Sequence, residues 1–398
     1  MSRILYVWEL GDGYGHTNCF LPLALELRQR GHEIIFALRD LSYAQVLLGQ
    51  YGFAYVQAPV WLPLAVGLPA PPLNYAEILH RFGYLDPAGL GAMVRAWRQL
   101  YEWVQPDLIL ADHAPTALLA ARGTGIPRSL LGNGFFSPPR VDPTPNFRPW
   151  LEVSAQRLMD SDAAALATSN QVLAELGVAP LKRLVDLFEV EEDFLCTFPE
   201  LDHYSQRQDA HYWGPIFSQQ GRAEPHWTDA PGKRIFVYLR PRHQDFQQVL
   251  LALRHRADPV LIHAPTLPDR LIEQYQSDRL QFSSQPFNMA QLRATCDLAI
   301  CHGGHGTTAA MLLAGIPLLL LPLHLEEYLL SQQVVSLGAG LIAEPEGQEP
   351  DYPSLIDRLC QPSFTEQAKA FAHQYAAFDQ HQQLQAIGDR CEALIRRH

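Results

Sequence analysis

The chain has few charged residues and no excess of basic ones. Charged residues make up 18% of the 398 residues, and the formal net charge is -12. A nucleic-acid backbone or an anionic membrane surface attracts a basic field, so neither is expected as the main partner. A small anionic ligand can still bind where a few local groups favour it.

Long apolar runs, a leader segment and paired cysteines are also missing. The run IPLLLLPL (316–323) has the length of a strand and is too short to span a bilayer. Met1 is followed directly by a strand pattern without the features of a secretory signal, which predicts a cytoplasmic protein. The six cysteines form no CxxC pair, which favours reduced thiols and predicts no metal site.

Apolar strand patterns alternate with helix patterns in both halves of the chain. Because the strand patterns are almost continuously apolar, they indicate parallel sheets that helices cover on both faces. The sequence therefore predicts an α/β protein of the GT-B kind: two tandem Rossmann-like, doubly wound parallel-sheet domains that face a cleft, where such sheets bind ligands. The expected strands are 4–8, 33–38, 53–57, 107–111, 128–132, 234–239, 259–264, 280–284, 298–302 and 318–323.

The domain boundaries are predicted from composition. We expect an N-terminal domain over 1–218, a linker over the polar stretch 219–233 and a C-terminal domain over 234–375. The segment 363–396 has a helical pattern throughout, and its last part, 376–398, is expected to pack back on the first domain as a helix.

The stretch ELGDGYGHTNC (9–19) follows the first strand and contains three glycines. A dinucleotide-binding loop would need G-x-G-x-x-G, but the third glycine position holds His16. Thr17 or Asn18 is the expected N-cap of the next helix, with Pro22 in its first turn. His16 is then predicted just before a helix N-terminus, at the carboxyl end of the first strand.

His16 is a candidate general base. A neutral imidazole at this position can take a proton from a substrate hydroxyl, provided that a third group fixes its tautomer. Asp112, at the end of the strand 107–111, is the predicted partner, because neighbouring parallel strands deliver their carboxyl ends to one edge. Strand alternation predicts that His113 points to the other side. The alternative is that His16 is a structural loop histidine.

The stretch CHGGHGTT (301–308) joins a strand to a helix in the second half. Glycines let the backbone approach a phosphate, and the first N–H groups of a helix attract an anion. The predicted ligand set is His302, Gly303, Gly304, His305, Gly306 and Thr307. The alternative is a tight turn in which the two histidines are incidental.

This region resembles the donor-binding signature of the family 1 GT-B glycosyltransferases, which include macrolide, flavonoid and glucuronosyl transferases. The signature HGG-x-GT is matched at 302–307, followed by AGIP at 314–317, PLHLEE at 322–327 and GAG at 338–340. The first half, GYGHTNCFLPLALELRQRGHEI, is similar to the family's GHxxPxLPLAxxLxxRGHEV, and PDLILADHAP resembles the segment that carries the aspartate partner. The resemblance implies that His302 and the loop backbone hold the donor diphosphate and that Glu326 and Glu327 face the sugar hydroxyls.

Three departures from the family pattern concern the donor. Glu327 stands where glutamine is usual, which exchanges an amide donor for a carboxylate acceptor. Arg240 and Pro241 stand where the family commonly has Gly-Ser or Gly-Thr after the first strand of this half, and Arg240 is either a diphosphate ligand or a surface residue. The segment that packs on the nucleobase in the family contains Phe287 here and lacks tryptophan, so the base preference stays open.

Two proline-rich, aromatic stretches, 58–75 and 133–150, interrupt the strand and helix pattern of the first half. They are either surface loops or the walls of an apolar acceptor pocket. The pocket interpretation rests on aromatic residues at Trp61, Tyr75, Phe135, Phe136 and Trp150.

The resulting functional prediction is an inverting, metal-independent glycosyltransferase that needs no cofactor. Its co-substrate is expected to be a nucleoside diphosphate sugar, for which we favour a UDP-sugar, and its acceptor a small apolar molecule. Two alternatives stay open on the same scaffold: a non-catalytic nucleotide-sugar-binding accessory protein and a nucleotide-sugar epimerase.

Overall fold

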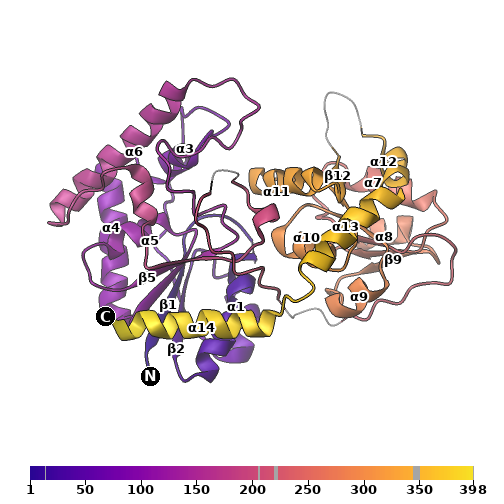
Figure 1. Ribbon diagram of the computed structural model, residues 1–398, viewed down its shortest axis with the longest axis horizontal. Coiled ribbons are helices and arrows are strands. Elements are labelled where there is room, and N and C mark those ends of the chain that lie inside the picture. Colours follow the sequence, from indigo (N-terminus) through magenta and orange to yellow (C-terminus); the bar gives the residue numbers. More distant parts are fainter. Residues whose placement is uncertain (14, 205–206, 219–222, 344–349, 398) are drawn as a thin grey trace. The chain divides into compact units, whose positions relative to one another are not determined.

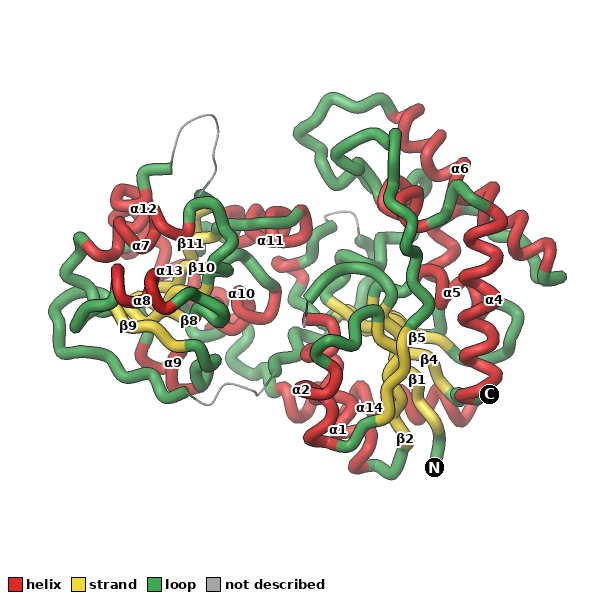
Figure 2. The backbone as a smooth tube through the Cα atoms, turned by 180° about the vertical axis from the view of Figure 1, so that it is seen from behind, coloured by secondary structure: helices red, strands yellow, loops and turns green. Residues whose placement is uncertain are grey.

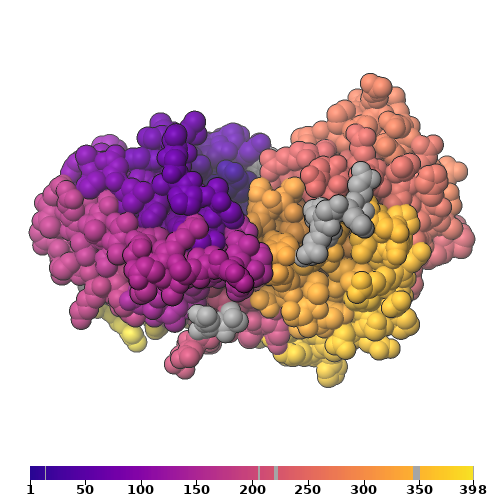
Figure 3. Space-filling view, turned by 90° about the horizontal axis from the view of Figure 1, so that it is seen from above, coloured from indigo at the N-terminus to yellow at the C-terminus, as the bar shows by residue number. Residues whose placement is uncertain are grey.

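The computed structural model describes residues 1–13, 15–204, 207–218, 223–343 and 350–397. The chain forms two compact units. Unit 1 contains Met1–Phe198, Tyr204–Ile216 and Gln380–His398, and unit 2 contains Pro199–His203 and Phe217–Asp379. Of the predicted linker 219–233, residues 219–222 lie outside the described residues. The surface of unit 1 is built from both early and later parts of its chain, coloured indigo to magenta in Figure 3.

Unit 1 is built on a six-stranded sheet in which every neighbouring pair is parallel. Its strand order, β3-β2-β1-β4-β5-β6, is the order of a doubly wound nucleotide-binding sheet. The strands are β1 (Arg3–Trp8), β2 (Glu33–Leu38), β3 (Ala54–Gln57), β4 (Leu108–Asp112), β5 (Arg128–Gly132) and β6 (Glu192–Leu195).

Helices cover both faces of this sheet (Figures 1 and 2). On one face, Tyr6 and Trp8 of β1 pack with Phe20 and Leu23 of the first helix in a continuous buried core. Because strand side chains alternate, this core takes every second residue of β1. The helices are α1 (Gly15–Gln29), α2 (Ala44–Leu48), α3 (Tyr75–Leu79), α4 (Pro87–Val104), α5 (Pro115–Ala121), α6 (Ala155–Glu175) and α14 (Gln380–Arg397).

The last helix, α14, packs beside α1 in unit 1, as Figures 1 and 2 show. Its buried residues Leu384, Ile387, Cys391 and Leu394 recur at helical spacing and join the same core. Burying an aliphatic side chain stabilises a fold by roughly 1.5–3 kcal/mol. The prediction of one helical segment over 363–396 is wrong, because the chain leaves the helix between Gln374 and Gln380.

Unit 2 repeats the same topology with shorter strands. Its order, β12-β11-β10-β7-β8-β9, is that of unit 1 read from the other edge, and all pairs are again parallel. The strands are β7 (Ile235–Tyr238), β8 (Val260–His263), β9 (Leu280–Ser283), β10 (Leu298–Cys301), β11 (Leu318–Leu320) and β12 (Gly340–Ile342). The helices are α7 (Phe246–Arg254), α8 (Asp269–Tyr275), α9 (Met289–Thr295), α10 (His305–Leu312), α11 (Leu325–Ser336), α12 (Tyr352–Leu359) and α13 (Pro362–Gln374).

The strand order fixes where each unit can bind a ligand. The order reverses between β1 and β4 in unit 1 and between β7 and β10 in unit 2. In doubly wound sheets, ligands bind outside the carboxyl ends of the strands at this switch point. The two loops singled out in the sequence, after β1 and after β10, both start at these positions.

Candidate active site

In unit 1, the structure brings His16 and Asp112 together. Asp112 is the last residue of β4 and lies beside Trp8, the last residue of β1, in the parallel register. The Nδ1 atom of His16 lies 2.9 Å from Oδ2 of Asp112, and both side chains are largely buried. Because the carboxylate can only accept, Nδ1 carries the proton and the lone pair of the neutral ring lies on Nε2.

The start of α1 differs from the prediction. The helix begins at Gly15, so that His16 lies in its first turn, Thr17 is not the N-cap and Pro22 stands in the helix interior. The prediction placed the cap by the preference of threonine and asparagine for that position. The contact of His16 with Asp112 shows that tertiary packing, which also buries Thr17, determines where the helix starts.

A third residue, Tyr6, holds the carboxylate from inside the core. Its hydroxyl donates a hydrogen bond of 2.9 Å to the same Oδ2 atom of Asp112 that contacts His16. The Tyr6 ring stacks on Phe20 at 4.3 Å, and complete burial raises the pKa of its hydroxyl well above the ordinary value. Tyr6 therefore stays protonated and acts as a permanent donor. Sequence reasoning missed it because the strand pattern treats Tyr6 as one more apolar residue.

Gly11 keeps the space beside the second ring nitrogen of His16 open. A Cβ atom on Gly11 would lie 2.6 Å from Nε2 of His16 and 3.3 Å from Nδ1 of His113. Gly11 also has a φ of +89°, which L side chains rarely adopt. A substrate hydroxyl can approach Nε2 at this place only if position 11 has no side chain.

The loop offers a matched pair of substitutions. Gly13 has nearly the same φ, +84°, but a Cβ there would meet no atom within 4 Å. Gly11→Ala and Gly13→Ala should each lose about 1–2 kcal/mol of stability to backbone strain, measured by denaturant unfolding. Gly11→Ala alone is expected to lose transfer activity, by roughly 10²-fold, because it displaces the reacting groups. Equal activities of the two variants would contradict the assignment of this space to the substrate.

His113 lies on the same side as His16, which corrects the prediction from strand alternation. The strand ends at Asp112, and His113 has a left-handed φ of +45° that turns its side chain back. Its ring stacks on Phe136 at 3.6 Å, and its centroid lies 6.3 Å from that of His16. Burial lowers the pKa of His113 well below the ordinary value, so the ring is neutral at pH 7.

Aromatic rings enclose the His16 imidazole on two sides. The Trp8 ring stacks on it with a centroid distance of 5.0 Å, and the half-buried Phe136 ring lies at 5.4 Å. These contacts fix the ring plane and exclude water from one side of it. Trp8, like Tyr6, is a residue that sequence reasoning counted only as part of an apolar strand.

Glu9 is a second buried carboxyl group near this loop. Its Oε2 atom accepts hydrogen bonds from the backbone N–H groups of Thr116 (2.8 Å) and Ala117 (3.3 Å) at the start of α5. Burial raises the pKa of Glu9 to about 7. These hydrogen bonds connect the loop after β1, which leads to His16, with the start of α5, which follows His113.

The other predicted acceptor residues are spread through unit 1. Tyr75 is fully buried with its ring 6.0 Å from that of His113. Phe135 packs on Phe147 at 5.3 Å, in the interior of the unit. The indole of Trp61 lies against the start of α4, close enough that a Cβ on Gly89 would meet it at 2.6 Å, and Trp150 is 44% exposed. Phe136, by contrast, contacts the His16 ring, with a centroid distance of 5.4 Å.

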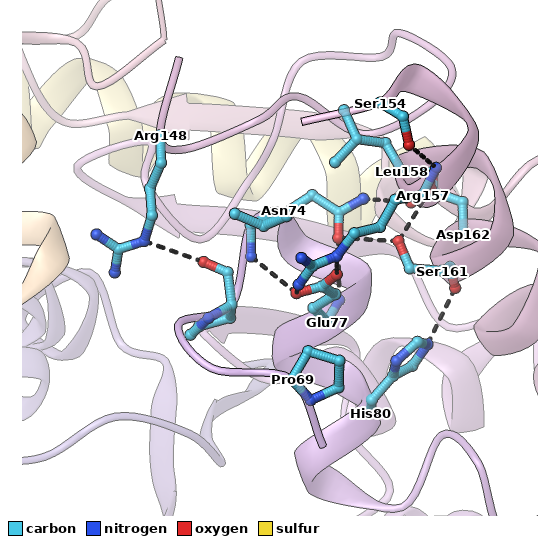
Figure 4. A network of polar contacts seen from close by, with 12 residues as sticks. Pro69, Asn74, Glu77, His80, Arg148, Ser154, Arg157, Leu158, Ser161 and Asp162 are labelled. Carbon is cyan, nitrogen blue, oxygen red and sulfur yellow. Dashed lines mark hydrogen bonds and ion pairs between the residues drawn. The ribbon is translucent and has the colours of Figure 1, made fainter. Parts of the chain in front are cut away.

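A buried polar network holds the two proline-rich loops against α6 (Figure 4). Asp162 of α6 accepts hydrogen bonds from the side chain of Asn74 (2.9 Å) and from the hydroxyl of Thr144 (2.6 Å). Arg157 of α6 forms an ion pair of 2.9 Å with Glu77. Each loop is thus fixed by charge-assisted hydrogen bonds, which are about twice as strong as neutral ones.

In unit 2, the loop after β10 has the geometry of an anion site. His302 is 5% exposed, and its Nδ1 atom lies 3.2 Å from the carbonyl oxygen of Tyr238. A Cβ on Gly303, whose φ is +81°, would meet Ser331 Oγ at 2.7 Å, so a larger residue does not fit there. A Cβ on Gly304 would lie 3.1 Å from Nε2 of His302, so this glycine leaves the second ring nitrogen accessible.

The first turn of α10 supplies the backbone donors. Gly304 is its N-cap residue, and the N–H groups of His305, Gly306 and Thr307 precede the first helical hydrogen bond, from Thr308 to Gly304. Burial and the neighbouring His203 lower the pKa of His305 to about 3, so its ring adds no positive charge.

Arg240 adds a cation beside this loop. It lies two residues after the end of β7 and is half-buried, and the part of the chain that the structure describes provides no hydrogen bond or ion pair to its guanidinium. Its charge contributes to lowering the pKa of His302, which places the two groups within electrostatic reach. The guanidinium would stabilise an anion bound near it.

The remaining predicted donor residues differ in their surroundings. Glu326 lies in the first turn of α11 and is half-buried. Glu327 is buried, with Oε2 accepting from the backbone N–H of Leu323 at 2.8 Å and Oε1 lying 3.7 Å from His302 Nε2. Phe287 is 6% exposed and packs edge-on against Phe236, which leaves little ring surface for a nucleobase.

The described residues contain neither a metal-binding cluster nor a helix that could span a membrane. Over these residues, no group of three or more histidine, cysteine, aspartate and glutamate side chains is placed to hold a metal ion. In the same part of the chain, no helix has the length and apolar character needed to cross a membrane.

The chain is similar to known glycosyltransferases in sequence and in fold. Residues 284–393 match the family described as "Erythromycin biosynthesis protein CIII-like, C-terminal domain". A PGL/p-HBAD biosynthesis glycosyltransferase from Mycobacterium tuberculosis (strain ATCC 25177 / H37Ra) is 24% identical over 311 residues, which are 72% of each chain. The solved glycotransferase of kitacinnamycin superposes with a TM-score of 0.73 at 20% identity, covering 99% of both chains. The fold is GT-B, and the comparisons support a glycosyltransferase.

A further structural neighbour concerns the donor. The glycosyltransferase VinC, solved in complex with dTDP, superposes with a TM-score of 0.67 at 18% identity over the full length of both chains. The predicted fold class is therefore confirmed. In this glycosyltransferase, the His16 and Asp112 pair lies in unit 1 and the glycine-rich loop after β10 lies in unit 2, each at the switch point of its sheet.

Proposed function

We propose that this glycosyltransferase moves a sugar from a nucleoside diphosphate sugar to a hydroxyl group of a small apolar acceptor, with inversion at the anomeric carbon and without a metal ion. The observation that carries the proposal is the 2.9 Å contact between Nδ1 of His16 and Asp112, which leaves the ring's lone pair on Nε2. A hydroxyl is a poor nucleophile until such a base takes its proton.

The proposed reaction is a single displacement. The acceptor hydroxyl passes its proton to Nε2 of His16 while its oxygen forms a bond to the anomeric carbon. The bond between that carbon and the phosphate oxygen breaks, and the electron pair leaves with the nucleoside diphosphate. The Asp112 carboxylate stabilises the imidazolium that forms, and Tyr6 keeps this carboxylate oriented.

The donor diphosphate is assigned to the loop after β10. The backbone N–H groups at the start of α10 and the Arg240 guanidinium supply positive potential that a divalent cation would otherwise provide. Glu326 is the proposed contact of the sugar hydroxyls. The nucleobase stays a prediction. The family resemblance favours uridine, whereas VinC holds dTDP, so the binding experiment includes both nucleotides.

The acceptor class is argued from the surroundings of His16. The half-buried Phe136 ring flanks the imidazole and offers an apolar surface on which an aromatic or alicyclic acceptor can pack. The names of structural neighbours, including the kitacinnamycin glycotransferase and the calicheamicin glycosyltransferase CalG4, support natural products as the acceptor class.

Thermal unfolding in the presence of nucleotides tests the donor assignment. UDP, dTDP and their glucose conjugates are each added up to about 100 times the dissociation constant, where binding to the folded state adds about 2.7 kcal/mol of stability. We expect at least one of the four to raise the unfolding temperature, and Gly303→Ala to reduce that increase. No stabilisation by any of them would contradict the proposal. Conversion of the sugar nucleotide to an epimer without an acceptor would show that the protein is an epimerase instead.

A further inference from the structure

His302 cannot donate a hydrogen bond to a phosphate while it is neutral. Its Nδ1 atom lies 3.2 Å from the Tyr238 carbonyl oxygen, which is only an acceptor, so the proton of the neutral ring is on Nδ1. Nε2, the nitrogen next to Gly304, then carries a lone pair. A lone pair facing an anionic phosphate oxygen repels it. A second proton is needed before this side of the ring can bind the diphosphate.

Glu327 is positioned to balance the positive charge that a second proton places on His302. Its Oε1 atom lies 3.7 Å from Nε2 of His302, and His302 and Glu327 are 5% and 8% exposed. The other oxygen, Oε2, is held by the N–H groups of Leu323 and His324, which fixes the carboxylate in place. Glu327 is thus a preorganised counter-charge for an imidazolium at His302.

Other titratable groups face His302 from the surrounding elements. Arg240, after β7, and His324, before α11, oppose a positive ring, and burial lowers the pKa of His302 below its ordinary value. The Tyr238 ring packs edge-on at 4.9 Å, and His243 interacts electrostatically with the same Glu327 carboxylate. The negative charge of Glu327 is opposed by the positive charge of Arg240, so His302 is neutral in the absence of a ligand. A bound diphosphate adds negative charge and thereby favours the protonated ring.

We propose that binding of the sugar nucleotide takes up one proton at Nε2 of His302, with Glu327 as the counter-charge that makes this protonation possible in a buried site. The inference rests on the proposed function, since it concerns the same donor site. The proton comes from the solvent, one N–H bond forms, and the ring then makes a charge-assisted hydrogen bond to the diphosphate. The proton is released when the nucleoside diphosphate leaves.

Calorimetry measures this proton directly. UDP-glucose and dTDP-glucose are suitable probes, because a diphosphate esterified at both ends has no ionisation near neutral pH. The binding enthalpy is measured at pH 7.5 in buffers of different ionisation enthalpy, and its slope gives the number of protons taken up. We expect a value near one, and a dissociation constant that rises roughly tenfold per pH unit above pH 7.5.

Three variants locate the proton. His302→Gln places an amide N–H near the position of Nε2, and it should bind the probe with no proton uptake. Glu327→Gln keeps an oxygen for the N–H groups of Leu323 and His324 but removes the charge, so uptake at pH 7.5 should fall and reappear at lower pH. His255→Gln, which changes an exposed histidine at the end of α7, should leave the uptake near one.

The outcomes separate the inference from the proposed function. Failure of both sugar nucleotides to bind the wild-type protein overturns the proposed donor site and the inference with it. Binding without proton uptake overturns the inference alone and leaves the donor site standing. Uptake that persists unchanged in His302→Gln also overturns it, because the proton would then go to another group.

Discussion

Replacing His16 with alanine is expected to reduce sugar transfer by roughly 10²- to 10⁴-fold, the usual contribution of a general base. Donor affinity should stay within about twofold, because the diphosphate is assigned to the loop after β10, in the other unit. Initial rates of transfer and calorimetric donor binding, measured on the same preparation, separate the two effects.

His32→Ala is the matched control, since His32 follows the opposite end of α1 and its ring contacts Glu392 of α14. This variant should keep the wild-type rate. Transfer by His16→Ala at a rate similar to that of the control would show that His16 is not the base. A loss of donor binding in His16→Ala would indicate a structural role for the imidazole.

Asp112→Asn should reduce transfer by at least about 10²-fold. Tyr6 and His16 both contact the same oxygen of Asp112, so an amide oxygen can accept from both and keep the imidazole in place. The substitution therefore removes mainly the negative charge that stabilises the imidazolium. The measurement is the transfer rate at saturating donor, together with a crystal structure of the variant to verify the position of His16.

Asp107→Asn is the control for this substitution. Asp107 precedes the same strand β4 at its opposite end, where its carboxylate accepts from the backbone N–H of Arg3 at 2.6 Å. We expect its rate to stay near that of the wild type. If Asp112→Asn is as active as Asp107→Asn while His16 keeps its position, the negative charge on Asp112 plays no part in the reaction.

The architecture was predictable because parallel strands buried on both faces leave a clear pattern. Ten apolar segments were expected and all ten are strands, although their bounds differ by a residue or more at several ends. The two missed strands, β6 and β12, lie at sheet edges. Sequence EDFL in β6 is half polar and β12 has three residues, so neither shows the continuous apolar run of a central strand.

The pairing of His16 with Asp112 was also predictable, since both residues lie near the carboxyl ends of two adjacent parallel strands, β1 and β4. The contribution of Tyr6 was not, because its hydroxyl reaches Asp112 across the core from a position that an apolar pattern explains equally well. The orientation of His113 depends on a left-handed φ, which local sequence gives no reason to expect for histidine. Such side-chain positions depend on long-range contacts and on unusual backbone angles, which a local sequence pattern does not show.

Glu327 illustrates a further limit of sequence reasoning. Family resemblance placed it at the sugar hydroxyls, but its contacts in the structure are the backbone N–H groups before α11 and the imidazole of His302. The exchange of an amide for a carboxylate changes the charge next to the proposed diphosphate site. Its effect can be argued only once the distance to His302 and the burial of both groups are known.

The stereochemistry of the product tests the central claim most directly. The wild-type protein is incubated with an α-configured sugar nucleotide, a panel of aromatic and macrocyclic alcohols and a metal chelator, and the anomeric proton of the product is recorded by NMR. A single displacement assisted by His16 predicts a β-linked product, formed at the same rate with and without the chelator. An α-linked product, or transfer that stops when the chelator is added, would contradict the account.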